Sequence, residues 1–196
     1  NSSGYVTTPL VVTGGGGAQP PPSYPKILIT EIQISGLEDD KEEFVELYNP
    51  EETEVDLTNW YLQRKTKTAT VYSSFATSAL FSGKQIKTKE HFLVARESSS
   101  FTDLADITTD NPLTKDNVLV FKNPNGEITD KIGWGQAQDF EGVPTENPEP
   151  GKSLARIWNL ETQEYQDIDN NSLDFKIQVP TPKEINQIPE PEPEPS

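Results

Sequence analysis

Short apolar runs and alternating apolar and polar positions recur along the middle of the chain. Residues 27–34 end in an apolar–polar alternation, and no stretch keeps a helical period over three turns. The pair Asn125-Gly126 separates two apolar runs, which is typical of a β-hairpin. The predicted strands are residues 27–34, 43–48, 55–64, 70–75, 91–95, 118–121, 128–132, 154–158 and 173–177. Many short strands divided by turn residues predict an all-β sandwich or barrel.

The N-terminal part departs from this pattern. Residues 1–25 carry no charged side chain, and they contain four consecutive glycines, residues 14–17, followed by three prolines, residues 20–22. The glycines predict a flexible hinge and the prolines a stiff spacer. A predicted strand precedes the hinge, and its apolar residues are Tyr5, Val6, Leu10, Val11 and Val12. This strand, which Pro9 interrupts, is either the last strand of a preceding domain or a strand that pairs with the sheet edge of a neighbouring molecule.

The C-terminal end has the composition of a spacer. Between residues 189 and 195 proline alternates with glutamate, so the charges repel one another and no core can form. We therefore expect three parts. They are a β-rich, uncharged N-terminal extension at residues 1–25, a β-sandwich at residues 26–188 and a Pro-Glu spacer at residues 189–196.

Several short motifs follow one another in an order that identifies a family. Residues 29–32 match the pattern I-x-E-I, residues 43–50 match E-F-I-E-L-Y-N-P, and residues 55–62 match V-D-L-S-G-W-x-L. Residues 151–156 match G-x-S-L-x-R, and residues 174–186 are similar to D-F followed by P-T-P-G-x-x-N. Each motif is weak alone, but their shared order resembles that of bacterial lamin tail domains. Two glycines of the pattern are replaced, by Asn59 and by Lys183.

The resemblance implies an immunoglobulin-like β-sandwich with extended N- and C-terminal segments. In nuclear lamins this domain is a non-enzymatic interaction domain of a filament protein. In bacteria it occurs in exported and surface proteins, often beside hydrolases or further sandwich domains. The family supplies no catalytic residue, and a fold alone does not define a function.

Composition and charge exclude several classes of function. The chain has 16 basic and 32 acidic residues, a net charge of −16, which argues against nucleic-acid partners and anionic membranes. Without cysteine and with only His91 as histidine, thiolate zinc sites and imidazole clusters are excluded. No run approaches the roughly 18 apolar residues of a membrane span. The one carboxylate pair on neighbouring strands, Glu31 and Glu46, is expected on the solvent face. We therefore expect no catalytic site and no enzyme.

The charges are unevenly distributed along the sequence. Residues 38–56 hold ten acidic residues and one basic residue, whereas residues 62–89 hold six basic residues and no acidic one. These segments are either solvated loops or the two halves of a head-to-tail contact between copies of the chain. The candidate interface residues are Arg64, Lys65, Lys67, Lys84, Lys87, Lys89, Glu38, Asp39, Asp40, Glu42 and Glu43.

Two loops are rich in oxygen ligands and raise the question of calcium. The candidate ligands are Asp39, Asp40, Glu42, Asp167 and Asp169. Neither loop has the D-x-[DN]-x-[DN]-G spacing of a calcium loop, so calcium is a weak alternative and no other cofactor is expected. Trp134, which lies between two glycines, is the best candidate for a sugar-binding platform.

These observations favour a non-enzymatic structural or adhesive module of a secreted or cell-surface protein. It would act through protein–protein contacts with a partner or with other copies of the chain. The alternative is an accessory module of a larger extracellular enzyme that binds carbohydrate or calcium.

Overall fold

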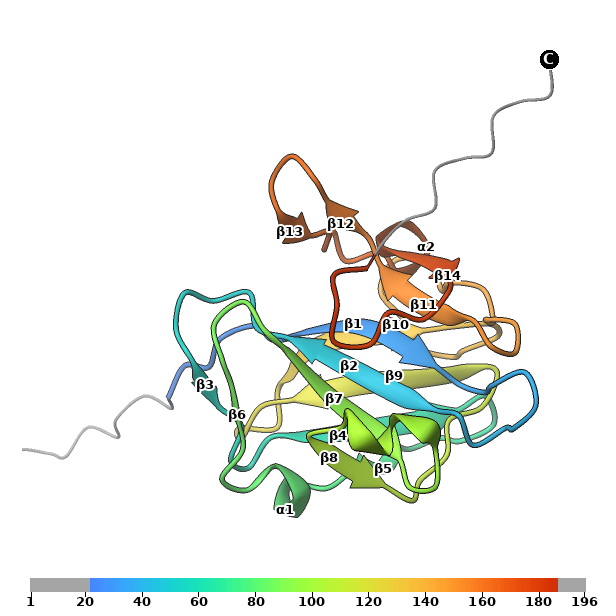
Figure 1. Ribbon diagram of the computed structural model, residues 1–196, viewed down its shortest axis with the longest axis horizontal. Helices are drawn as coiled ribbons and strands as arrows, with labels where there is room; N and C mark the ends of the chain where they lie inside the picture. Colours follow the sequence, from blue (N-terminus) through green and yellow to red (C-terminus); the bar gives the residue numbers. More distant parts are fainter. Residues whose placement is uncertain (1–21, 187–196) are drawn as a thin grey trace, which may run out of the picture.

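Two β-sheets that face each other account for most of residues 22–186, the part of the chain that the computed structural model describes (Figure 1). The first sheet has six strands in the order β14 (Phe175–Gln178), β11 (Ser153–Arg156), β1 (Leu28–Gln33), β2 (Phe44–Tyr48), β7 (His91–Arg96) and β8 (Ile107–Thr109). The second has four strands in the order β10 (Ile128–Gly133), β9 (Asn117–Lys122), β4 (Tyr61–Thr66) and β5 (Ser73–Ala76). The predicted all-β sandwich is confirmed.

The remaining elements are small. Two short ribbons pair β3 (Val55–Asp56) with β6 (Gln85–Ile86), and β12 (Trp158–Asn159) with β13 (Glu164–Tyr165). The helical elements are α1 (Ser78–Phe81), α2 (Asn171–Asp174) and a 3-10 turn (Ser100–Asp103). Each is a single turn, which agrees with the absence of a helical period in the sequence.

The core lies between the two sheets, and both supply aromatic residues to it. Trp60 is fully buried and stacks on Phe121 with ring centroids 5.0 Å apart. Tyr24 meets the edge of Trp60 at 5.8 Å. Because Tyr24 packs on the core, the folded unit begins a few residues before the expected boundary at Lys26.

The segment at residues 55–64, predicted as one strand, forms two strands in different sheets. The Trp60 N–H donates to the Leu57 C=O, and the Asp56 side chain accepts a hydrogen bond from the Thr58 N–H. These two bonds close a turn between β3 and β4. Local apolar pattern could not reveal this break, because both halves are apolar.

The hairpin between β9 and β10 is confirmed. The Gly126 N–H donates to the Asn123 C=O, and Gly126 has φ +82°. Pro124 precedes Asn125 in this turn, and the positive φ falls on the glycine alone. This arrangement is typical of a type I turn followed by a left-handed residue.

Left-handed backbone also explains the two departures from the family motifs. Asn59 has φ 70° and Lys183 has φ 68°, and both stand where the family pattern has glycine. Glycine adopts positive φ without a Cβ clash, and asparagine is among the few other residues that tolerate it. The backbone of the motif is therefore retained although the residue is changed.

Substitution at Asn59 tests this explanation. Asn59→Ala should lower the free energy of unfolding by about 1 kcal/mol, because a Cβ without a polar group is disfavoured in left-handed backbone. Asn59→Gly should leave stability unchanged or raise it by about a few tenths of a kcal/mol. Urea unfolding followed by tryptophan fluorescence measures both changes. Equal destabilisation by Ala and Gly would contradict the explanation.

Candidate functional site

The predicted interface residues lie at two opposite ends of strand β2. The acidic loop before β2 contains Glu38, Asp39 and Asp40. At the far end, the Asn49 side chain holds the turn of residues 84–90 through the carbonyls of Ile86 and Lys87. The acidic loop and the lysines of residues 84–89 are thus separated by the length of the strand.

The lysines at the far end have acidic neighbours. Lys89 pairs with Glu52 at 3.1 Å, and Lys87 lies 3.9 Å from Glu90. Lys84 belongs to the same turn and is exposed. The basic character of residues 84–89 is therefore largely offset by acidic groups around it.

The other basic residues lie near the acidic loop. Arg64 is within electrostatic reach of Glu43, Lys65 lies 4.0 Å from Asp139, and Lys67 donates to the Gln136 side chain. The structure therefore divides the basic segment between both ends of the sandwich. It does not bring the six basic residues together.

Glu43 requires a correction, because it is an interior residue and not part of a surface. It is 1% exposed, forms an ion pair with Arg96 and accepts a hydrogen bond from the Leu113 N–H. Burial raises its pKa, while these two partners lower it. Its neighbour Glu42 accepts hydrogen bonds from the Ser100 N–H and hydroxyl, so it orders the adjacent loop.

The proposed tryptophan platform is also wrong. Trp134 is fully buried, and its indole N–H donates to the Thr114 C=O at 2.9 Å. Its backbone pairs with Thr145 and with Asn117. Trp134 is thus a core residue that joins three segments, and a sugar cannot stack on it.

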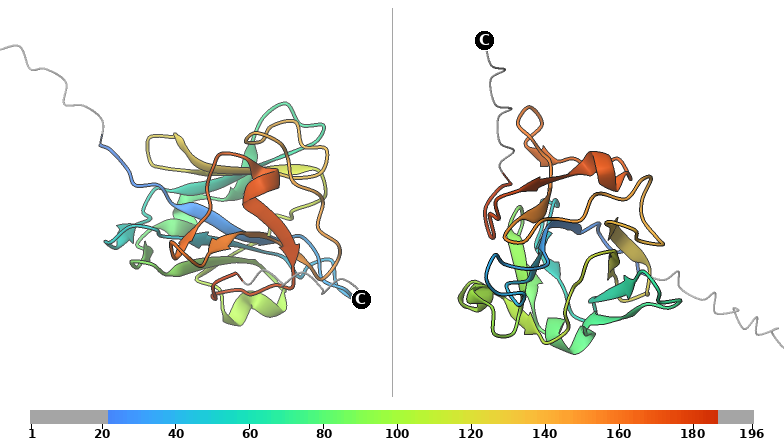
Figure 2. Two further views of the ribbon diagram at one scale, coloured as in Figure 1. Left: turned by 90° about the horizontal axis from the view of Figure 1, so that it is seen from above. Right: turned by 90° about the vertical axis from the view of Figure 1, so that its right-hand side faces the viewer.

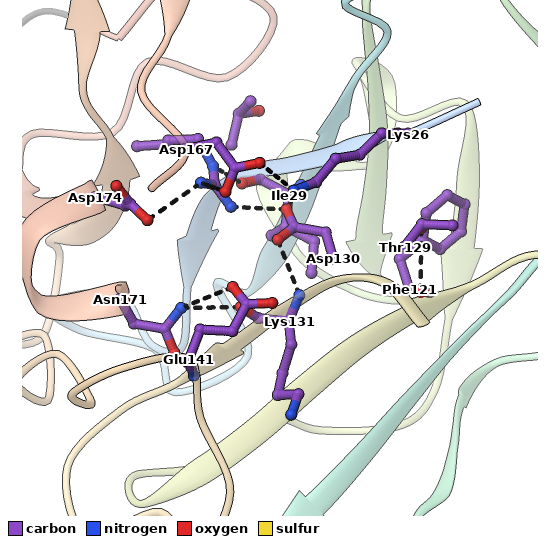
Figure 3. A network of polar contacts seen from close by, with 12 residues as sticks. Lys26, Ile29, Phe121, Thr129, Asp130, Lys131, Glu141, Asp167, Asn171 and Asp174 are labelled. Carbon is purple, nitrogen blue, oxygen red and sulfur yellow. Dashed lines mark hydrogen bonds and ion pairs between the residues drawn. The ribbon is translucent and has the colours of Figure 1, made fainter. Parts of the chain in front are cut away.

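Arg156 is the centre of a buried ionic cluster that the sequence did not single out. Figure 3 shows the acidic members Asp130, Asp167 and Asp174, which come from different elements. Its side chain is fully buried and donates to Asp130 Oδ2 at 2.7 Å, to Asp167 Oδ1 at 3.2 Å and to the Ile29 C=O at 2.8 Å. The guanidinium carbon lies 4.5 Å from the Phe175 ring centroid. This residue is the arginine of the motif at residues 151–156.

The carboxylates around Arg156 are close enough to suggest a metal site. Oxygen atoms of Asp130, Glu141 and Asp167 lie within 4.8 Å of one another. Arg156 already supplies a positive charge at the centre of the group, however, and Lys26 pairs with Asp167. The cluster is therefore an internal ion-pair network, and Asp167, a calcium candidate, is one of its members.

Glu141 differs from the other two acids of this trio, because it makes no close ion pair with Arg156 or Lys26. Burial, with a further contribution from Asp130, raises its pKa to about 7. Its backbone N–H donates to Asn171 Oδ1, which also accepts from the Gly133 N–H. Asn171 thereby fixes the Glu141 loop to the end of β10.

Glu31 and Glu46 form a second buried cluster, and here the expectation of a solvent-exposed pair is wrong. They face each other across β1 and β2, and both are completely buried. The reason is that residues 180–186, here called the C-terminal strap, cross the outer face of the six-stranded sheet. Glu31 accepts from the Thr181 N–H at 3.0 Å, and Glu46 accepts from the Lys183 N–H at 2.6 Å.

The strap is held by further buried polar groups. The Asn186 side chain donates to the carbonyls of Thr30 and Arg156, each at 2.9 Å. The Asn186 N–H donates to the Tyr165 hydroxyl, which lies 2.9 Å from His91 Nε2. The strap thus supplies partners to backbone and side-chain groups that would otherwise face water.

Ionisation in this cluster is strongly perturbed. Burial raises the pKa of Glu31 to about 7, and burial together with the nearby Glu31 charge raises that of Glu46 to about 8. Burial and the Lys183 charge lower the pKa of His91 to about 4. Such shifts are common at active sites, but these carboxyl groups are enclosed and bonded to the strap, so their arrangement is that of a structural clamp.

A groove of about 410 Å³ lies along the outer side of β14, the last strand of the six-stranded sheet. One wall is β14 and the other is the segment at residues 144–146. The lining residues are Pro144, Thr145, Glu146, Ser172, Phe175, Lys176 and Ile177. No local pattern in the sequence marks this groove, because its walls are brought together by long-range pairing.

The strand-donor candidates Tyr5, Val6, Leu10, Val11 and Val12 lie outside the described residues. Within residues 22–186, no helix is both long enough and apolar enough to cross a membrane.

Comparisons with known proteins agree with this fold, which defines a two-sheet sandwich of the immunoglobulin-like class. The family model "Lamin Tail Domain" matches residues 20–136. The chain therefore belongs to the lamin tail domain family. The fold is also similar to the crystal structure of a DUF4876 family protein from Bacteroides thetaiotaomicron, with a TM-score of 0.52 and 11% identity, over 77% of this chain and 70% of that one. No curated protein matches the sequence.

The pH dependence of stability tests the glutamate clamp. The pKa values of Glu31 and Glu46 are raised from 4.5 to about 7 and about 8. Between about pH 4.5 and pH 8 these two groups therefore bind more protons in the folded state than in the unfolded state. Stability should therefore fall as pH rises, by at most about 1.4 kcal/mol per pH unit for each carboxyl. Below about pH 6.5 the lowered pKa of His91 opposes this trend, so the fall should be clearest from about pH 6.5 to 8.

Glutamine substitution assigns this slope to the clamp. Glu46→Gln keeps an acceptor for the strap but removes a titrating group, so unfolding by urea should show a shallower fall across the same pH range. Glu90→Gln changes an exposed glutamate and serves as the control with an unchanged slope. A wild-type stability that rises across this range would contradict the clamp.

Removal of Arg156 tests the ionic cluster. Arg156→Met should lower the free energy of unfolding by about 3–5 kcal/mol, because it leaves the buried Asp130 charge without a partner. Adding Asp130→Asn should recover part of this loss, since the amide oxygen of the new side chain can still accept from the Ile29 N–H. A double-mutant cycle by urea unfolding measures the coupling. Additive losses would contradict an ionic tie between these residues.

Proposed function

We propose that this lamin tail domain is a non-enzymatic structural or adhesive module of a secreted or cell-surface protein. It acts through protein–protein contacts, including contacts between copies of the chain. The exported location of bacterial proteins with similar domains supports the first part. The internal pairing of the charged clusters supports a non-enzymatic role, and the groove beside β14 supports protein–protein contacts.

The observation that carries this proposal is that the fold encloses its clusters of titratable groups. Glu31 and Glu46, the one pair suited to acid–base chemistry that the sequence suggested, are fully buried and bonded to the strap. Asp130 and Asp167 form ion pairs with the buried guanidinium of Arg156. A substrate would have to displace part of the fold to reach either cluster. The accessible feature is instead a groove beside a strand edge, a kind of surface that binds extended peptides.

Turnover and association together test the proposed function. The chain should show no hydrolysis of ester, phosphoester, glycoside or peptide substrates above the buffer rate. Light scattering after size exclusion should show a molar mass that rises with protein concentration. Hydrolysis that Glu31→Gln or Glu46→Gln abolishes would contradict the proposal. So would a strict monomer whose tryptophan fluorescence responds to millimolar calcium or to glycans.

A further inference from the structure

Within the part of the chain that the structure describes, strand β14 presents a free backbone edge. In antiparallel pairs, residues alternate between bonding to the neighbour and facing away from it. The bond from the Ile157 N–H to the Asp174 C=O sets this alternation, so Lys176 and Gln178 bond to β11. The N–H and C=O of Ile177 are therefore directed away from the sheet, into the groove. The Phe175 N–H, which faces the same way, already donates to the Asn171 C=O.

The opposite wall of the groove does not use this edge. The chain runs beside α2 as far as Val143, whose C=O accepts from the Ser172 N–H. It then diverges at Pro144, which has no N–H. The N–H and C=O of Thr145 pair with Gly133 and Gly135 and thus turn away from β14. The two walls therefore separate, and Ile177 lines the groove between them. The right panel of Figure 2 shows α2 and β14, drawn in orange-red, along one margin of the molecule.

Apolar side chains surround the groove. Val143 is 52% exposed, Leu173 50% and Val179 61%, and each adjoins a lining residue or the end of β14. The lining itself holds one acid, Glu146, and one base, Lys176. A groove with an open strand edge, apolar flanks and no net charge fits an extended, apolar and uncharged peptide segment.

The chain itself contains a segment of this kind. Residues 5–13 form an apolar, β-branched run, and residues 1–25 carry no charge in a chain of net charge −16. Such a segment is not repelled when it approaches another copy. Pro9 within it is compatible with a strand added at a sheet edge, because its missing N–H can face solvent.

The groove and the point where the described chain begins lie at opposite ends of the molecule. The Pro22 C=O accepts from the Asn125 side chain at the β9–β10 turn, whereas Thr145 in the groove pairs beyond the other end of β10. Strand β10 has six residues, a length of about 20 Å. Figure 1 shows the chain entering β1 at the left and β14 at the right. The nine residues 13–21 span at most about 30 Å, so a return to the chain's own groove would use about two-thirds of their reach.

We infer that the groove beside β14 accepts residues 5–13 of a second copy of this chain as an added strand. The inference rests on the proposed function and identifies its surface and partner. Each copy then supplies a donor segment, which precedes Pro22 in the sequence, and an acceptor edge at β14. A contact of this type is heterologous, so it continues from copy to copy into an open chain unless it closes into a ring.

Four single variants test the donor segment and the acceptor edge separately. Val11→Glu places a charge within the donor segment, and Gln19→Glu places the same charge outside it as a control. Ile177→Pro removes the free backbone N–H at the edge, and Ile177→Ala shortens the side chain but keeps that N–H. Sedimentation velocity over a range of concentrations should show association about tenfold weaker for Val11→Glu and Ile177→Pro than for their controls.

Mixing the two weakened variants distinguishes the loss of one contact surface from simple misfolding. Val11→Glu retains an intact edge and Ile177→Pro retains an intact donor, so their mixture should form a one-to-one complex that neither forms alone. In that complex, the Ile177 amide of the Val11→Glu chain should exchange its hydrogen more slowly. Association of the wild type should persist or strengthen at high salt, because salt screens the repulsion between acidic copies.

Several results would overturn the inference. They are a wild type that stays monomeric, a mixture that stays monomeric, or association that survives both Val11→Glu and Ile177→Pro. Association that high salt abolishes would favour the charged loops instead. In that last case, and where association survives both variants, the proposed function stands while the strand-donor inference fails.

Discussion

The sandwich is tied together at one edge by the buried guanidinium of Arg156. This group extends from β11 in the six-stranded sheet, and its partner Asp130 extends from β10 in the four-stranded sheet. Asp130 also accepts from the Ile29 N–H, so one carboxylate joins both sheets. A buried charge is stable only when its hydrogen-bonding sites are filled. The loop that contains Asp167 and the helical turn α2, which ends at Asp174, must therefore close around the guanidinium.

The same constraint shapes the outer face of the six-stranded sheet. The side chains of Glu31 and Glu46 extend from neighbouring strands on the same face of the sheet. Repulsion between two carboxylates there disfavours the ionisation of both. The strap relieves this by donating backbone N–H groups from Thr181 and Lys183, and its left-handed residue at Lys183 directs one of them toward Glu46. The carboxyl pair and the strap require each other, so the strap is part of the fold of the domain.

The sequence was sufficient for the architecture but not for these clusters. Most strand positions, the Asn123–Gly126 turn and the family motifs depend on short-range pattern, and the structure confirms them. The exceptions include residues 55–64, which form two strands, and residues 173–174, which belong to α2. Alternation within a strand distinguishes two faces, but it does not tell whether a distant segment covers the polar one. Glu31 and Glu46 were therefore expected in water. Arg156 was missed for a related reason, because arginine is rarely fully buried without partners, and its partners come from residues 130 and 167.

These internal ties also explain why the open edge falls at β14. The Arg156 cluster fixes β11 to β10 of the other sheet, and the strap covers β1 and β2. Strands β11, β1 and β2 of the six-stranded sheet are therefore enclosed. On the other side, the Thr109 hydroxyl at the end of β8 donates to the Phe75 C=O of β5, which joins that margin to the second sheet. Strand β14 lies beyond the guanidinium, and the loop at residues 144–146 is held away from it by Thr145 pairing with Gly133 and Gly135. The interactions that stabilise the domain thus leave the Ile177 backbone available for a further strand.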